Sequence, residues 1–129
     1  MIYVASKTKH AGKWLAYRDG GYPINSTWID EAGPGETQDF TDLWTRCCLE
    51  VNSAKVLVAY REKGEVLKGA FIEIGVALSK PKMVLLAGDW EGFSFAAHPV
   101  VRNMVTLNEA MAVASRICKT SSIIHTRAH

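Results

Sequence analysis

The sequence has little of what marks several common classes of protein. It contains only three cysteines, and none has the spacing of a metal motif. No apolar run approaches the ~18 residues that span a membrane, and residues 1–5 are too short an apolar segment to predict a signal peptide. The net charge of +2 comes without a run of lysine and arginine, so nucleic acid is not an expected partner. These absences favour a cytoplasmic protein with reduced cysteines and no metal.

What is present is an alternation of strand-like and helix-like segments. Apolar segments predict strands at 1–5, 22–25, 54–60 and 82–87, with a short fifth strand near 104–105. Helical spacing predicts helices at 9–18, 40–51, 69–78 and 106–117, the last opened by a capping box of Thr106 and Glu109. This alternation indicates parallel strands joined by right-handed crossovers. We therefore expect one domain, 1–129, with a parallel sheet of about five strands covered on both faces.

Three further segments predict irregular structure. Glycine and proline predict a loop at 31–36, and residues 88–99 predict a loop that carries three aromatic side chains. The tail 121–129 has no periodicity, which predicts a mobile end or a segment that reaches a neighbour.

Glu73 is a lone carboxylate in the apolar helical run 69–78. A buried carboxylate costs several kcal/mol unless it is paired or used in chemistry. In an open parallel sheet this helix would begin at the ligand-binding edge, with Glu73 in its first turn or two. The sequence therefore predicts that Glu73 is a catalytic nucleophile or base. The alternative is that Glu73 lies on a solvent-exposed stripe of the helix.

The segments that follow the predicted strands carry most of the unusual side chains. They are 6–10, 26–30, 61–68 and 88–98, and they are expected to meet at one edge of the sheet. Hydroxyls and cations in 6–10 stand at a helix start, where backbone N–H groups favour an anion such as phosphate. The alternative is a solvated, capped helix start. No Walker motif and no GxGxxG is present, so nucleoside triphosphates and dinucleotide cofactors are not expected.

Candidate substrate-binding residues follow from this placement. His10 and His98 can donate to a substrate oxygen or base nitrogen, or can lie on the surface. Trp28 and Trp90 can stack on a heterocycle, as can the two phenylalanines of the loop 88–99. Alternatively, Trp28 can cover the sheet edge, and the phenylalanines can anchor their loop or form an exposed patch with Trp90. Trp44 is expected in the core. The predicted substrate-binding set is Ser6, Lys7, His10, Trp28, Asp30, Gly69, Trp90 and His98.

Three stretches of the chain resemble the nucleoside 2-deoxyribosyltransferase superfamily, in a small phage- or prophage-type form. They are Ile2-Tyr3-Val4-Ala5-Ser6, Gly69-Ala70-Phe71-Ile72-Glu73-Ile74-Gly75-Val76-Ala77 and Lys80-Pro81-Lys82-Met83-Val84-Leu85-Leu86. The resemblance implies a flavodoxin-like three-layer α/β sandwich and a homodimer or higher homo-oligomer. It also implies that Glu73 attacks the anomeric carbon of a deoxyribose.

The chain departs from the family pattern near the third strand. The family usually carries an Asp there, where this chain has Lys55, and a second Asp before the nucleophile, for which Glu62 or Glu65 must serve. The expected function is therefore cleavage or exchange of the N-glycosidic bond of a (deoxy)nucleoside or its 5′-monophosphate. Glu65 is the candidate acid that protonates the leaving base. The alternatives are a non-catalytic protein that binds a nucleotide or ADP-ribose-like ligand, and a partner-binding domain.

Overall fold

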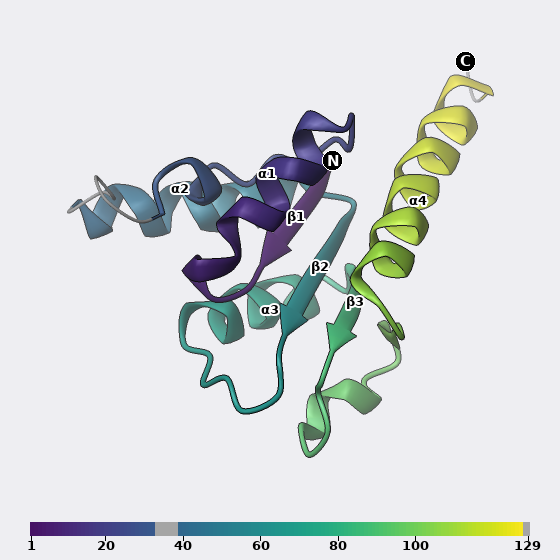
Figure 1. The fold of residues 1–129 in the computed structure, drawn as a ribbon. Helices are drawn as coiled ribbons and strands as arrows, with labels where there is room; N and C mark the ends of the chain where they lie inside the picture. Colours follow the sequence, from purple (N-terminus) through teal and green to yellow (C-terminus); the bar gives the residue numbers. More distant parts are fainter. Residues whose placement is uncertain (33–38, 128–129) are drawn as a thin grey trace.

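The computed structural model describes residues 1–32 and 39–127, with side chains as far as residue 120. Its centre is a parallel sheet of four strands in the order β1-β2-β3-β4 (Figure 1). The strands are β1 (Ile2–Ala5), β2 (Val56–Arg61), β3 (Met83–Gly88) and β4 (Val101–Asn103). The apolar runs of β1, β2 and β3 are almost wholly buried, which is typical of a parallel sheet covered on both faces. Because all strands are parallel, their carboxyl ends lie at one edge.

The helices form two layers around this sheet. On one face lie α1 (Ala11–Asp19) and α4 (Leu107–Arg127), joined by a hydrogen bond from the Tyr17 hydroxyl to Asn108. On the other face α2 (Phe40–Ser53) packs against α3 (Gly69–Ser79). Short 3-10 helices, η1 (Thr8–His10), η2 (Trp28–Asp30) and η3 (Ser94–Ala97), follow β1, the 22–25 segment and β3. The predicted flavodoxin-like three-layer α/β fold is confirmed.

The strand predicted at 22–25 is reduced to a single bridge between Ile24 and Ile2, so the described sheet has four strands rather than about five. Ile2 N–H donates to Pro23 O (2.8 Å), and Asn25 N–H donates to Ile2 O (3.0 Å). Beyond that point side chains replace the backbone ladder. Val4 N–H donates to Ser26 Oγ (2.8 Å), and Trp28 Nε1 donates to Val4 O (2.8 Å).

Other predicted boundaries also differ from the structure. The last strand was expected at 104–105 but is Val101–Asn103, where one residue in three is buried and the apolar signal is weak. Helix α4 continues to Arg127, ten residues beyond its predicted end at 117. The expectation that the tail is mobile or reaches a neighbour stays a prediction. The predicted helix 9–18 divides into η1 and α1. Most of the loop predicted at 31–36 lies outside the described residues.

The predicted capping box opens α4, because Thr106 Oγ1 accepts the Glu109 N–H at 3.1 Å. From there Ala110, Met111 and Ala114 turn a fully buried stripe toward the sheet. Within the described part of the chain, no helix has the length and apolar character needed to cross a bilayer.

Candidate active site

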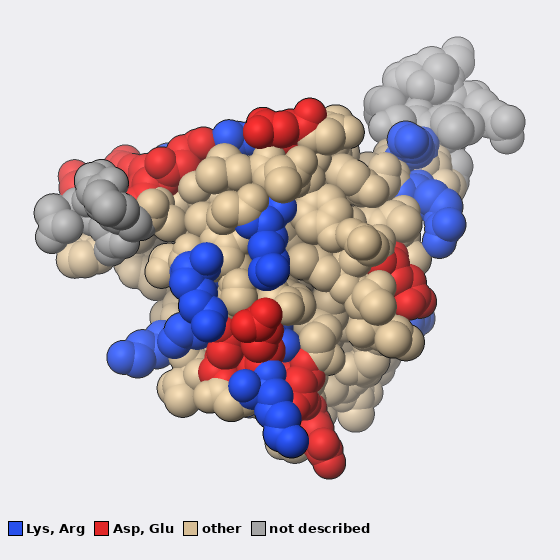
Figure 2. All heavy atoms as spheres, viewed as in Figure 1, with Lys and Arg blue, Asp and Glu red and all other residues tan. Residues whose placement is uncertain are grey.

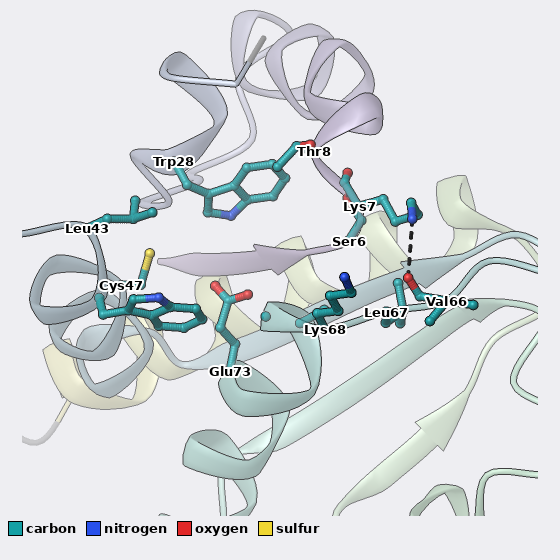
Figure 3. Close-up of a pocket in the computed structure, with 13 residues that line it drawn as sticks. Ser6, Lys7, Thr8, Trp28, Leu43, Cys47, Val66, Leu67, Lys68 and Glu73 are labelled. Carbon is teal, nitrogen blue, oxygen red and sulfur yellow. Dashed lines mark hydrogen bonds between the residues drawn. The ribbon is translucent and has the colours of Figure 1, made fainter. Parts of the chain in front are cut away.

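A pocket of about 340 Å³ opens at the carboxyl edge of the sheet, between the loop after β1, η2, α2 and the start of α3. Glu73 points into it from α3 (Figure 3). The apolar wall includes Trp28, Leu43, Trp44 and Cys47, and the polar wall includes Ser6, Lys7, Thr8 and Lys68. The pocket therefore offers aromatic surface on one side and hydroxyls and ammonium groups on the other, around one carboxyl group.

Glu73 is 8% exposed, and its carboxyl Oε2 accepts a hydrogen bond from the Tyr3 hydroxyl. Tyr3 belongs to β1 and is fully buried, so the sheet itself fixes this donor. Burial raises the pKa of Glu73 to about 8 because desolvation penalises the charged form. A carboxyl group with this pKa gains and loses its proton near neutral pH, which suits acid, base or nucleophilic chemistry.

Trp28 is placed by the hydrogen bonds that replace the missing strand. Its indole N–H is bound to Val4 O, so the ring lies over the end of β1 and lines the pocket. The preceding Thr27 is held by Glu50 of α2, which accepts from its N–H (3.1 Å) and its hydroxyl (2.7 Å). These contacts fix the indole ring before any ligand arrives.

Trp44 lies against the first residue of α3. A Cβ atom added at Gly69 would lie 3.1 Å from Trp44 Cη2, so the absence of a side chain there makes room for the indole. Trp44 was expected in the core, but it is half-buried and lines the pocket. The two indole rings give the apolar wall a surface on which a planar base can stack.

The polar wall is built around Ser6 and Lys7. Trp14 Nε1 donates to Ser6 Oγ (2.8 Å), which donates in turn to Lys7 O (2.9 Å). Lys7 Nζ donates to Val66 O (3.2 Å), joining the loop after β1 to the loop before α3. Lys68 is the N-cap residue of α3 and adds a second ammonium group. Two cations beside a helix amino end favour an anionic group such as phosphate.

Cys47 lines the same pocket, but its chemistry differs from that of Glu73. Burial raises the pKa of the Cys47 thiol to about 11. The nucleophilic form of cysteine is the thiolate, and at this pKa the side chain stays a thiol at neutral pH. Cys47 therefore contributes apolar surface.

The structure brings Ser6, Lys7, Trp28, Gly69 and Glu73 of the predicted site together in this pocket. It places the other predicted residues elsewhere in the described part of the chain. These are His10 and Glu65, which bind each other at 2.8 Å, and Asp30, Trp90 and His98.

Asp30, Trp90 and His98 each have a structural partner. Asp30 makes a two-bond ion pair with Arg18 (2.9 and 2.7 Å), whose hydrogen bond lowers the pKa of the Asp30 carboxyl. Trp90 is 6% exposed and donates to Ala87 O (2.8 Å). His98 Nδ1 accepts the Val100 N–H (3.1 Å).

The aromatic loop after β3 packs largely against itself. The rings of Trp90, Phe93 and Phe95 lie 5.6 to 5.9 Å apart. Phe71 of α3 lies beside Phe93, and the Arg61 guanidinium stands 4.9 Å from the Phe93 ring centre. These contacts anchor the loop, in agreement with the alternative to ligand stacking.

The sequence did not predict several residues of the site, among them Thr8, Trp44, Cys47 and Lys68 in the pocket walls. Nor did it predict Tyr3, which does not line the pocket but donates to Glu73. Tyr3 and Trp44 have the strand and helix patterns of core residues. Lys68 was visible as the residue before the Glu73 helix, where a side chain reaches the ligand edge of the sheet.

Fold and pocket together define a flavodoxin-like α/β protein with a pocket at the carboxyl edge of its sheet. No protein-family model and no curated protein matches the sequence. Among solved structures, the chain is similar to the CMP N-glycosidase BcmB of Clostridium botulinum. The TM-score is 0.55 and the identity 15%, over 90% of this chain and 96% of that one. At this identity the likeness establishes the fold.

On the face shown in Figure 2, acidic and basic side chains lie close together in several places. Nucleic-acid-binding proteins usually present a continuous basic surface. The described basic side chains on this face do not form one.

Proposed function

We propose that this protein cleaves or exchanges the N-glycosidic bond of a nucleoside 5′-monophosphate, with Glu73 as the nucleophile. The observation that carries the proposal is the position of Glu73: a buried carboxyl group in a pocket with two indole rings on one side and two lysines on the other. A nucleotide has matching parts. Its base suits the indole wall, its phosphate suits Lys7 and Lys68, and its sugar falls between them, near the carboxyl group.

The chemistry proceeds in two displacements. An oxygen of ionised Glu73 attacks the anomeric carbon, and the C–N bond breaks with its electron pair passing to the base. The departing base takes a proton, and water or a second base then displaces Glu73 from the sugar. The Tyr3 hydroxyl holds one carboxyl oxygen and leaves the other for attack. The role of Glu65 as the acid stays a prediction. Glu65 binds His10 and does not line the pocket.

The phosphate is the part of the substrate that the pocket supports most directly. Lys7, Lys68, two hydroxyls and the amino end of α3 stand on one wall, and each favours an anion. A nucleoside without phosphate would bring no anion to these two ammonium groups. The proposal therefore favours monophosphates over free nucleosides.

The decisive experiment follows base release from common ribo- and deoxyribonucleoside 5′-monophosphates by chromatography. We expect Glu73→Gln to fold normally and to lose about 10³-fold or more of the rate. The matched control is Glu91→Gln, which changes an exposed glutamate in the loop after β3 and is expected to retain the wild-type rate. Full activity in Glu73→Gln would remove Glu73 from the mechanism.

The pH profile distinguishes the role of Glu73. A nucleophile must be ionised, so with a pKa of about 8 the rate should rise about tenfold per pH unit from pH 6 and level off above pH 8. A general acid must be protonated, so it would give the opposite profile, with the rate falling above pH 8.

The second candidate function is nucleotide binding without cleavage. It is favoured by the pKa of Glu73, which leaves the carboxyl group mostly protonated at pH 7, and by the absence of a second carboxylate among the described residues that line the pocket. A monophosphate that raises the melting temperature without releasing base would support this function, because a ligand stabilises only the state that binds it.

A further inference from the structure

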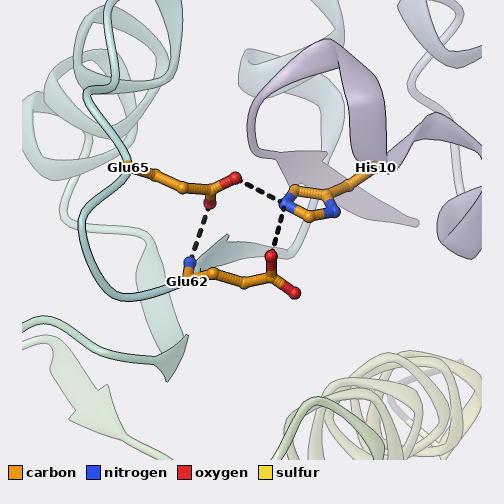
Figure 4. Close-up of side chains that lie close together, drawn as sticks. All are labelled: His10, Glu62 and Glu65. Carbon is orange, nitrogen blue, oxygen red and sulfur yellow. Dashed lines mark hydrogen bonds and ion pairs between the residues drawn. The ribbon is translucent and has the colours of Figure 1, made fainter.

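A second cluster of titratable side chains lies outside the Glu73 pocket and brings His10, Glu62 and Glu65 to one point (Figure 4). His10 Nε2 lies 2.8 Å from Glu65 Oε2 and 3.8 Å from Glu62 Oε1, and the three atoms lie within 4.8 Å of one another. A divalent ion that binds such atoms at ~2.1 Å holds neighbouring ligand atoms about 3 to 4 Å apart. The three atoms thus have separations close to those of a metal coordination sphere.

Both carboxylates are oriented toward this point by donors on their other oxygen. Glu65 Oε1 accepts the Glu62 N–H at 2.8 Å, and Glu62 Oε2 accepts the Tyr60 hydroxyl at 2.8 Å. The His10 ring is also held, since it meets the Tyr60 ring edge to face at 5.0 Å. Outer contacts of this kind orient the ligands of metal sites. They leave one oxygen of each glutamate directed at the same imidazole nitrogen.

The cluster is closed on one side and open on the other. The side chains of His10 and Glu65 are 5% and 7% exposed, whereas that of Glu62 is 43% exposed. At the open side stands Lys9, whose Nζ lies 3.4 Å from Glu65 Oε2 and 3.9 Å from Glu62 Oε1. A cation therefore already occupies the position between the two carboxylates. Because the Lys9 side chain is 60% exposed, it can move into solvent when another cation arrives.

We propose that His10, Glu62 and Glu65 bind a divalent transition-metal ion of the zinc class in place of the Lys9 ammonium group. One imidazole and two carboxylates are a ligand set that suits Zn²⁺, and three protein ligands leave a coordination position for water. The ion would join η1 to the loop that follows β2. That loop continues into Val66 and Lys68, so the metal would stiffen the polar wall of the Glu73 pocket.

Motif spacing could not predict this site, because its ligands are far apart in the chain. His10 and Glu65 are separated by 55 positions, whereas recognisable zinc motifs place ligands a few residues apart. Only parallel pairing of β1 with β2 brings the two loops together.

The test is a titration of chelator-treated full-length protein with Zn²⁺, followed by calorimetry and by melting temperature. We expect one equivalent to bind and the melting temperature to rise. Co²⁺ in place of Zn²⁺ should give the visible absorption of a four- or five-coordinate ion. Glu62→Gln changes a half-exposed position that should tolerate the substitution. Loss of an outer contact weakens metal binding by about tenfold, and we expect Glu62→Gln, which removes a ligand, to weaken Zn²⁺ binding by more than that.

Two further variants separate a metal site from an ion-pair cluster. Tyr60→Phe removes only the hydroxyl that orients Glu62 and should weaken Zn²⁺ binding by about tenfold. Lys9→Gln removes the competing cation and should tighten Zn²⁺ binding. The control is His98→Gln, a histidine outside the cluster, which should bind Zn²⁺ as the wild type does. The proposal is overturned if wild-type protein binds no Zn²⁺, if Glu62→Gln binds as tightly as His98→Gln, or if Lys9→Gln binds more weakly than wild type.

Discussion

Glu73 is a buried residue and Glu65 a half-buried one with a shielded side chain, and the pKa values of their carboxyl groups are shifted in opposite directions. The Glu73 residue is 8% exposed and the Glu65 side chain 7%. Burial raises the pKa of Glu73 to about 8, and the Tyr3 hydroxyl donates a hydrogen bond to its carboxyl group. Burial also acts to raise the pKa of Glu65, but the Glu62 N–H, His10 and Lys9 outweigh it and the pKa is lowered. Burial alone does not decide the charge of a carboxyl group; the donors around it do.

The difference separates two kinds of site at one edge of the sheet. The Glu65 region is held together by charge and has satisfied its carboxylates, which is how a structural or cation-binding cluster is built. The Glu73 region keeps one carboxyl group in a cavity that a ligand can fill. We expect the first region to stabilise the loops and the second to act on a substrate.

The largest effect that tests this contrast is the pH dependence of stability due to Glu73. Its pKa is higher in the folded state (about 8) than the ordinary glutamate value of 4.5, so the folded state binds more protons between these values. The free energy of unfolding should fall as the pH rises from about 4.5 to 8, by roughly 3–5 kcal/mol in total. Chemical denaturation at several pH values measures it.

The control for that prediction is Glu73→Gln, which has no group to titrate. This variant should lose most of the pH dependence and be more stable than wild type at pH 8. If wild type and Glu73→Gln show parallel stability curves, the carboxyl group is not strongly perturbed and the contrast with Glu65 is lost.

Glu65→Gln should have the next largest effect, with the opposite dependence on pH. Because the pKa of Glu65 is lowered in the folded state, its contribution is fully present above the unfolded value and is lost as the pH falls through the folded value. We expect a loss of about 2 kcal/mol at pH 7, the typical size for a hydrogen bond to a charged group. Denaturation at pH 7 and pH 3 checks it: the difference between variant and wild type should shrink at pH 3.

Much of this architecture could be predicted from the sequence. The apolar runs of β1 to β3 and the stripe of α4 each follow a simple period, and Glu73 stood out as the one charge in an apolar helix. The fold class and the helix that carries Glu73 depend on such local patterns. The absence of the strand predicted at 22–25 does not depend on a local pattern. Ser26 and Trp28 bind the backbone of Val4 through their side chains, and no periodicity indicates that side chains replace backbone hydrogen bonds there.

The composition of the pocket was less predictable, for a physical reason. Loops after parallel strands all reach one edge, but which side chains meet there depends on how far each loop folds back. His10 and Glu65 were expected beside Glu73, whereas the turn of η1 and the Glu62–Glu65 hydrogen bond direct them toward each other. Trp44 was expected in the core, because helical spacing does not distinguish a core side chain from one that lines a pocket.

Tyr3→Phe tests the hydrogen bond that distinguishes Glu73 from an isolated buried acid. The Tyr3 hydroxyl donates to Glu73 Oε2 and so favours the ionised form. Without it the pKa of Glu73 should rise further, and the midpoint of the pH–rate profile should move upward by about one unit. The rate at the high-pH plateau should change less than the rate at pH 7. An unchanged midpoint would mean that the hydroxyl does not influence the charge of Glu73.

Gly69→Ala should have the smallest effect and acts only on the pocket side of the contrast. Its Cβ would lie 3.1 Å from Trp44 Cη2 and 3.3 Å from Cζ2, so the indole must shift by a few tenths of an ångström. Alanine also favours the helix by up to about 1 kcal/mol over glycine, so the net change in stability should stay within about 1 kcal/mol. Nucleotide affinity should fall several-fold because the stacking wall has moved, while Zn²⁺ binding stays at the wild-type value. Titration of both ligands into the same variant makes this comparison, and a parallel loss of both would mean that the two sites share one rigid wall.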